Sequence, residues 1–155
     1  MSLERDLQEE QVGKLDLSHF VTVEIGTSVK ATIEKMQAEN QHCAIIVDKG
    51  ELVGIFTDRD IMHKVVDARE TWDLPVDDVM TPAPMTVNVK NRADMALALM
   101  DYKHFRNVPV LGDNGQVVGN LTHYAIIKYL SDRFPESVYN LPPDPEQIPQ
   151  QRGGA

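Results

Sequence analysis

The sequence has 155 residues, of which 42% are hydrophobic, enough to bury the core of one ordinary domain or of two small repeats. Its formal net charge of −9 argues against general binding to a nucleic-acid backbone, although a few arginines can still form a local pocket for a phosphorylated ligand. Its single cysteine cannot form an internal disulfide, and no apolar run approaches the roughly 18 residues of a membrane-spanning helix, so we expect a soluble cytoplasmic protein.

The chain contains an internal repeat in two copies. Three segments of the first copy align with three of the second: Val21–Val23 with Met85–Val87, Ala44–Val47 with Val108–Leu111, and Leu52–Thr57 with Val117–Thr122. The offset is 64 residues for the first two pairs (85 − 21) and 65 for the third (117 − 52). The extra residue falls in a turn at 112–115, where an insertion disturbs no core packing. A repeated supersecondary unit therefore organises the fold.

Each copy is predicted to form a strand, a helix, a strand, a hairpin turn, a strand and a helix. Before the first copy, Glu4–Val12 is predicted to form a polar helix. The first helix of the first copy is predicted to begin near Thr27 or Ser28, because both are good capping residues. The apolar face of this helix carries residues spaced i, i+4 and i+7, namely Val29, Ile33 and Met36.

Similar signals mark the second copy and the linker between the copies. Asn91 is predicted to cap the first helix of the second copy, and the last helix of each copy is predicted to begin at a threonine, Thr57 or Thr122. The linker contains three prolines, yet three of its apolar residues can pack as a short helical turn: Val76, Val79 and Met80.

The ends of the chain differ from the repeats. Five of the nine prolines lie from Pro135 onward, in a segment that cannot bury enough apolar surface to order itself. The predicted organisation is an N-terminal extension at 1–13, a first repeat at 14–70, a linker at 71–84, a second repeat at 85–134 and a Pro-rich disordered tail at 135–155.

The most informative segment is Gly54–Asp60, where a strand ends and a helix begins. The free N–H groups of the first helical turn favour an anion or a polar ligand there, and the carboxylate of Asp60 can accept from two vicinal hydroxyls, as on a ribose. Thr57 and Asp60 also have the spacing of a capping box, in which they only satisfy backbone donors. The spacing alone favours this structural role over ligand binding. The second copy keeps Thr122 but has Ala125 in place of Asp60, so Asp60 is not needed simply to start such a helix. This difference favours a ligand-binding role.

The repeat and three short motifs resemble a tandem pair of CBS domains, the repeats named after cystathionine β-synthase. The motifs are Val79–Pro82, Gly54–Asp60 and Arg106–Val110, and the resemblance covers roughly residues 14–133. It implies an α+β fold in which two β-α-β-β-α repeats pack about a pseudo-twofold axis, sheet face to sheet face. It also implies two clefts that typically hold AMP, ADP, ATP or S-adenosylmethionine.

The resemblance implies the residues of the first cleft. Thr57 and Asp60 would hold the ribose, and Ile55 would contact the base. The other implied ligand-binding residues are Thr86 and Val87 with their backbone at the adenine edge, Arg106 and Arg59 at the phosphate, and Asn107 and Pro109 in the wall.

The second cleft departs from the family pattern. Ala125 replaces the ribose carboxylate, and His42 and Cys43 stand where the first cleft has Arg106 and Asn107. A histidine is neutral for much of the time near pH 7 and is the weaker phosphate ligand. The residues of this weaker cleft are Thr22, Val23, His42, Thr122 and His123. We therefore expect one good site and one poor or empty site.

The sequence predicts a regulatory module that senses an adenine nucleotide and is not an enzyme. The histidines have no metal-ligand spacing, and no Ser–His–acid or Cys–His arrangement lies in a catalytic context, so we expect no metal and no catalytic cofactor. The resemblance implies a homodimer, and we expect no nucleic-acid or membrane partner. The alternative is a constitutive protein-interaction or dimerisation module with a vestigial cleft, which a ligand-induced rise in melting temperature would exclude.

Overall fold

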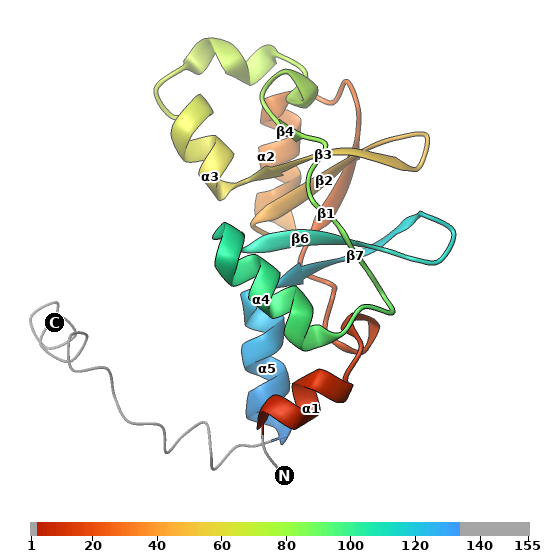
Figure 1. The fold of residues 1–155 in the computed structure, drawn as a ribbon. Coiled ribbons are helices and arrows are strands. Elements are labelled where there is room, and N and C mark those ends of the chain that lie inside the picture. Colours follow the sequence, from red (N-terminus) through yellow and green to blue (C-terminus); the bar gives the residue numbers. More distant parts are fainter. Residues whose placement is uncertain (1–2, 134–155) are drawn as a thin grey trace, which may run out of the picture.

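The computed structural model describes residues 3–133, in which two small sheets lie across each other and their hairpins extend to the same side (Figure 1). The predicted tail at 135–155 lies outside the described residues. Among residues 3–133, no helix has the length and apolar character needed to cross a membrane.

The first sheet has the strand order β1-β2-β3-β4. Its strands are β1 (Val21–Glu24), β2 (Cys43–Asp48), β3 (Glu51–Thr57) and β4 (Thr81–Pro82). β1 is parallel to β2, and β2 forms an antiparallel hairpin with β3 in which Cys43 pairs with Thr57. β4 comes from the predicted linker and pairs antiparallel with β3, where Thr81 lies opposite Ile55. The linker therefore contributes a strand that the sequence did not predict.

The second sheet repeats this topology with the order β5-β6-β7. Its strands are β5 (Val87–Asn88), β6 (Asn107–Leu111) and β7 (Val117–Thr122). β5 is parallel to β6, and β6 is antiparallel to β7, with Asn107 opposite Thr122. The predicted internal repeat thus has the same strand arrangement in both copies.

The helices that follow the first strand of each copy begin differently. α2 (Val29–Ala38) is capped by Ser28, whose hydroxyl accepts from the Ala31 N–H at 3.0 Å, as predicted. α4 (Ala93–Lys103) has Arg92 at its N-cap position, without a side-chain cap. The predicted cap at Asn91 is wrong, because its side chain instead accepts from the Asn88 N–H at 2.7 Å and closes the preceding turn.

The last helix of each copy begins at the predicted threonine but has a different length. In the first copy, α3 (Asp58–Asp60) passes directly into η2 (Ile61–Val65), a π-helical turn. In the second copy, α5 (His123–Arg133) is regular, and the Thr122 hydroxyl accepts from the Ala125 N–H at 3.2 Å. The short linker helix η4 (Val76–Asp78) follows η3 (Arg69–Asp73) and buries Val76 and Val79, as predicted.

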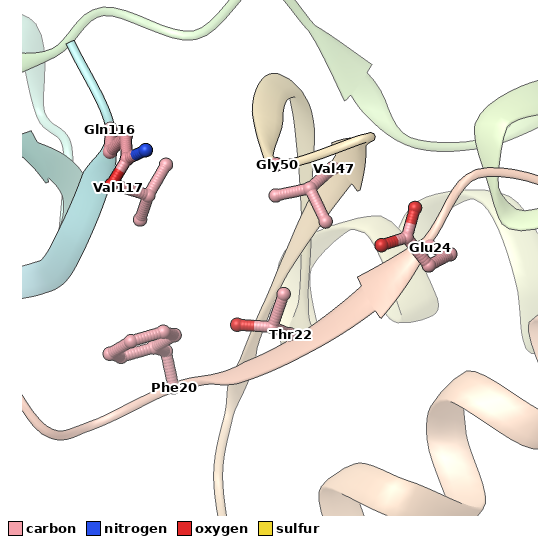
Figure 2. Close-up of a pocket in the computed structure, with 7 residues that line it drawn as sticks. All are labelled: Phe20, Thr22, Glu24, Val47, Gly50, Gln116 and Val117. Carbon is pink, nitrogen blue, oxygen red and sulfur yellow. The ribbon is translucent and has the colours of Figure 1, made fainter.

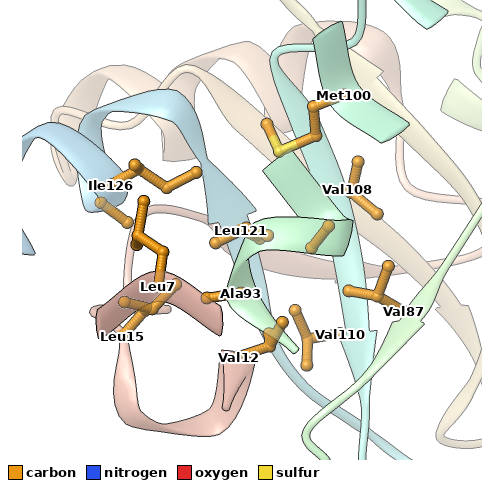
Figure 3. Close-up of a cluster of buried hydrophobic side chains, with 12 residues drawn as sticks. Leu7, Val12, Leu15, Val87, Ala93, Met100, Val108, Val110, Leu121 and Ile126 are labelled. Atoms are coloured by element: carbon orange, nitrogen blue, oxygen red, sulfur yellow. The ribbon is translucent and has the colours of Figure 1, made fainter. Parts of the chain in front are cut away.

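Three apolar clusters hold these elements together. One lies in the first repeat around Phe56, Ile46 and Val29, and one lies between the two sheets around Ile45 with Val117 of the other repeat. This contact confirms that the sheets pack face to face. The third cluster lies in the second repeat (Figure 3) and contains Leu7, Val12, Leu15, Val87, Val108, Val110, Leu121 and Ile126.

Figure 3 also shows that the N-terminal segment packs into the second repeat. α1 (Leu3–Glu9) and η1 (Val12–Lys14) lie in the predicted polar segment, yet Leu7 and Val12 are buried. The backbone continues along the second sheet, where the Asn120 N–H donates to the Leu17 carbonyl at 2.9 Å. Each repeat is therefore covered by the segment that precedes the first strand of the other.

In each repeat, the segment that comes before the first strand of the other repeat crosses the third strand. Two equivalent glycines allow this crossing segment to pass close to that strand. A Cβ at Gly54 would collide with the side chain of Met80, and a Cβ at Gly119 would collide with Leu17. Close approach of the crossing segment to the third strand thus requires glycine in both copies.

Candidate functional site

The predicted ribose motif lies at the junction of β3 and α3. Thr57 is the N-cap residue, and its N–H donates to Oδ2 of Asp60 at 3.1 Å, as in a capping box. Asp60 is buried, with 6% of its surface exposed, although it lies in the first turn of a helix. A buried carboxylate is costly unless it is well paired, so the other carboxylate oxygen, Oδ1, is expected to have partners of its own.

The second carboxylate oxygen of Asp60 has two further donors. Oδ1 accepts from the Thr81 hydroxyl at 3.0 Å and from the Lys64 ammonium at 2.9 Å. Lys64 also donates to the Val79 carbonyl at 2.9 Å. Asp60 is therefore tied both to the π-helical turn and to the segment that leads from one repeat to the other.

The equivalent place in the second repeat is apolar. Ala125 replaces Asp60, and Leu17 of the crossing segment takes the position of Thr81; both lie in the core of the second repeat. α5 nevertheless extends over 11 residues from Thr122, whereas α3 extends over three. A helix thus begins at this place without the carboxylate, in agreement with the inference that Asp60 is not needed to start it.

Ile55 lies on β3, two residues before Thr57 of the predicted ribose motif. It pairs with Ile45 and with Thr81 in the first sheet, and its side chain packs in the cluster between the two sheets. Arg59 lies in α3 and is exposed. Ile55, Thr57 and Asp60 are therefore gathered at one end of β3, together with Thr81 and Lys64.

The residues predicted from the second repeat lie on or next to β5 and β6 of the second sheet. Val87 is buried and pairs with Val110, and half-buried Thr86 directly precedes it. Pro109 is buried and lies opposite Asn120. Arg106 is exposed just before β6, and neither it nor Arg59 forms an ion pair within residues 3–133.

Asn107 is held within its own repeat. Its Oδ1 accepts from the Asn120 side chain at 3.0 Å, and its backbone pairs with Thr122. Asn107 is thus joined to β7, the strand that ends at Thr122. Within the described part of the chain, Asn107 forms no hydrogen bond with Asp60.

The residues of the weaker cleft are spread over more elements. Thr22 is exposed on β1, whereas Val23 points into the core of the first repeat. Exposed His42 lies 2.8 Å from the carboxylate of Asp58, between Nδ1 and Oδ2. Thr122 is buried, and His123 is half-buried with an Nδ1 atom that has no partner among residues 3–133.

Thr22 also lines a cavity of about 420 Å³ between the two repeats. Figure 2 shows its lining, which comes from the first strand, from the hairpin ends of both sheets and from the residue before β1: Phe20, Thr22, Glu24, Val47, Gly50, Gln116 and Val117. The charged residue of this lining is the carboxylate of Glu24, so the cavity wall offers no cation to a phosphate.

Sequence reasoning missed Lys64, Thr81 and Asn120. Lys64 lies four residues after Asp60, so the spacing of a helical ion pair was available as a signal. Thr81 carries no such signal, because it reaches Asp60 only through the pairing of β4 with β3. Asn120 is the repeat equivalent of Ile55 and is fully buried, so the second repeat has a polar side chain where the first has an apolar one.

The single cysteine, Cys43, is buried in β2. Burial, together with the charges of Asp60 and Asp58, raises the pKa of the Cys43 thiol from 9.0 to about 12. The thiol therefore stays protonated and unreactive near neutral pH. Within residues 3–133, no group of three or more His, Cys, Asp or Glu side chains is arranged to hold a metal ion.

Curated proteins from other organisms are similar to this chain in sequence. The "L-aspartate semialdehyde sulfurtransferase" of Methanosarcina acetivorans is 31% identical over 74% of the chain and 23% of that protein. The "Meiotically up-regulated gene 70 protein" of Schizosaccharomyces pombe is 32% identical over 72% of the chain and 17% of that protein. The chain thus spans less than a quarter of the length of these two curated relatives.

Solved structures share the fold. CBSX2 in complex with AMP superposes with a TM-score of 0.70 at 23% identity, covering 79% of this chain and 97% of that one. The cytosolic domain of the Mg²⁺ channel MgtE in complex with ATP gives a TM-score of 0.66 at 23% identity, covering 79% of this chain and 49% of that one. These likenesses confirm the predicted α+β class with two packed repeats.

The family model gives the assignment. The model described as "CBS domain" matches twice, at residues 12–67 and 76–132, which together cover most of the chain. Each match contains the three strands of one copy of the internal repeat, and the second match also includes β4, which pairs into the first sheet. The chain belongs to the CBS domain family and carries two CBS domains in tandem.

Proposed function

We propose that this chain is a regulatory module that binds an adenine nucleotide, AMP, ADP or ATP, in the first cleft and acts through binding rather than catalysis. CBSX2 with AMP and the MgtE domain with ATP support nucleotide binding by this fold. The observation that carries the proposal is the buried carboxylate of Asp60, which the equivalent helix of the second repeat does without.

Asp60 has the chemistry of a ribose ligand. A carboxylate accepts from two vicinal hydroxyls, and Oδ2 of Asp60 has one protein donor, the Thr57 N–H at 3.1 Å. Ile55 lies on the face between the sheets and pairs with Thr81, which contacts Asp60, so an apolar surface near the carboxylate is available to a base. We propose that Thr57 and Asp60 hold the ribose and that Ile55 contacts the adenine.

The phosphate needs a cation, and two arginines support this part of the site. Arg59 and Arg106 are exposed and carry no ion pair within the described residues, on a chain with a formal net charge of −9. We propose that both reach the phosphate, Arg106 from the second repeat. The backbone of Thr86 and Val87 would meet the adenine edge, and Asn107 and Pro109 would shape the wall.

We propose that the second cleft binds the same ligands weakly. Ala125 offers no acceptor to a ribose, and buried Asn120 replaces the apolar residue against the base. His42 is already 2.8 Å from Asp58, so a phosphate would compete with a carboxylate for it. Each of these differences lowers nucleotide affinity at Thr22, Val23, Thr122 and His123.

We propose that the module acts as a homodimer. Four large apolar side chains on α4 and α5 are more than half exposed: Met95 at 61%, Tyr102 at 78%, Tyr124 at 62% and Ile127 at 54%. A second copy can cover such helix faces. A ligand that binds one arrangement of repeats or subunits more tightly shifts the population toward it, and this shift regulates a partner.

The alternative is a constitutive interaction module with a vestigial cleft. The capping bond from Thr57 to Asp60 favours it, because this bond is a purely structural role for the carboxylate. Thermal unfolding with AMP, ADP, ATP and GTP separates the two functions. The proposal expects the adenine nucleotides to raise the melting temperature well above the effect of GTP. No shift with any adenosine compound would support the alternative, and equal shifts with GTP would contradict the preference for adenine.

A further inference from the structure

The hydrogen-bonding capacity of Asp60 is unevenly used. Each carboxylate oxygen offers two lone-pair positions. Oδ1 has two donors, Thr81 at 3.0 Å and Lys64 at 2.9 Å, whereas Oδ2 has one, the Thr57 N–H. A ribose diol that donates to both oxygens therefore finds a free position on Oδ2 and none on Oδ1.

One of the two donors on Oδ1 must yield to the ribose, and they differ in how firmly they are held. Thr81 lies in β4, where its backbone pairs with Ile55, and its short β-branched side chain places the hydroxyl on Oδ1. Lys64 reaches Asp60 through a long flexible stem, and 41% of its side-chain surface is exposed, against 8% for Asp60. An ammonium at such a position moves into water at small cost. The hydroxyl of a β-branched threonine leaves the carboxylate only by changing its χ1 rotamer.

We infer that Lys64 is a specificity-determining residue that competes with the ribose hydroxyls for Oδ1 of Asp60. This inference rests on the proposed function. Ligands without a vicinal diol leave the Asp60–Lys64 pair intact and gain nothing from the carboxylate. Ligands with the diol displace the ammonium, and their apparent affinity is lowered by the fraction of molecules in which the pair is closed.

Displacement of Lys64 also affects the segment between the repeats. The same ammonium donates to the Val79 carbonyl at 2.9 Å, next to Met80, which covers Gly54. A ligand that moves Lys64 away therefore removes one tie between the first repeat and this segment. The competing lysine thus couples the ligand site to the connection between the two repeats.

The test uses titration calorimetry on the full chain and on Lys64→Met, which removes the ammonium and keeps an unbranched stem. Lys30→Met, on the exposed surface of α2, is the matched control. The ligands are adenosine and 2′,3′-dideoxyadenosine, which lacks the diol. Neither carries a phosphate, so the loss of a positive charge does not change phosphate attraction.

We expect Lys64→Met to bind adenosine about two- to fivefold more tightly than the wild type, because a partly exposed ion pair no longer competes. Its affinity for dideoxyadenosine is expected to stay unchanged, as are both affinities of Lys30→Met. Lys64→Ala gives a second removal of the ammonium if Lys64→Met is poorly folded. A merely structural lysine would have the opposite effect, because its loss would disorder Asp60 and weaken adenosine binding.

The possible outcomes separate this inference from the proposed function. If the wild type binds adenosine and Lys64→Met binds it equally or more weakly, the inference is overturned and the proposed function stands. An equal gain for dideoxyadenosine also overturns the inference, because the effect then does not depend on the diol. If none of the proteins binds adenosine, the proposed function fails and takes the inference with it.

Discussion

The Thr81 hydroxyl donates to Oδ1 of Asp60 at 3.0 Å across 21 residues of sequence. This bond joins the segment between the repeats to the first turn of α3, and the pairing of Thr81 with Ile55 holds it in place. The carboxylate proposed to bind the ribose is thus positioned by a residue that the sequence places in a linker.

Thr81→Val removes this donor and preserves the shape of the side chain. We expect the variant to lose about 1 kcal/mol of unfolding free energy, the usual contribution of one hydrogen bond. We also expect it to bind adenosine several-fold more weakly, because the looser orientation of Asp60 outweighs the position that the missing hydroxyl leaves free on Oδ1. Chemical denaturation and calorimetry measure the two effects. Thr27→Val, at a half-buried threonine before α2, serves as the control. Unchanged stability and unchanged affinity would show that the bond has no role in positioning Asp60.

Substitutions of Asp60 separate its capping role from its ligand role. Asp60→Asn keeps an acceptor for the Thr57 N–H and removes the charge, whereas Asp60→Ala removes both. We expect both variants to lose about 1.5–3 kcal/mol of nucleotide-binding free energy, the value of a charge-assisted hydrogen bond. Their unfolding free energy is expected to fall by about 1 kcal/mol or less, as for a lost cap. If Asp60 is only a cap, stability falls and affinity measured well below the melting temperature stays intact.

Ala125→Asp is expected to damage the second repeat rather than restore its site. Ala125 is 2% exposed within an apolar core, where Leu17 replaces Thr81, so a new carboxylate there would have no donor from the crossing segment. Burial of an uncompensated polar group costs about 1–3 kcal/mol or more. Thermal unfolding measures the loss, and Ala98→Asp on the exposed face of α4 is the control. A stable variant with a second nucleotide site would contradict this expectation.

Arg106→Ala tests the phosphate assignment. Arg106 is exposed and caps no helix, so its loss is expected to leave the fold and adenosine binding nearly unchanged. AMP and ATP are expected to bind more weakly, because a charge-assisted contact to phosphate is lost. Arg69→Ala, at an exposed arginine of η3, is the matched control. Complete loss of adenosine binding in Arg106→Ala would show that the residue does not act on the phosphate.

The buried thiol gives a prediction that is independent of any ligand. Cys43 is 1% exposed, and burial raises its pKa to about 12, so the folded chain is expected to react with iodoacetamide at pH 8 far more slowly than the unfolded chain. Mass spectrometry of the alkylated protein with and without denaturant measures the difference. Equal rates in both states would contradict the burial of β2.

Much of the fold follows from local sequence patterns. The β-branched runs and turn residues predicted the two hairpins, and Ser28, Thr57 and Thr122 predicted three helix starts. The pattern failed where tertiary contacts decide the structure. β4 has two residues, one of them a proline, and forms because the third strand of the first sheet offers an edge to pair with.

The same limit applies to the N-terminal segment and to the site. Leu7 and Val12 lack helical periodicity, so the sequence did not indicate that they bury themselves in the second repeat. The ribose motif was visible as Thr57 and Asp60 because its residues are neighbours in sequence. Thr81 and Lys64 complete the surroundings of Asp60 through the strand pair and the π-helical turn, which local sequence does not specify. The ligand roles of the individual residues and the repeat boundaries at 14–70 and 85–134 stay predictions.

The most direct test of the central claim is titration of the full chain with AMP by calorimetry. The account predicts about one tightly bound AMP per chain, because Asp60 supplies a ribose acceptor in the first cleft and Ala125 supplies none in the second. It also predicts that GMP binds much more weakly, since the proposed base contacts are backbone groups matched to the adenine edge. An absence of binding, two equal sites per chain, or equal affinity for GMP would contradict it.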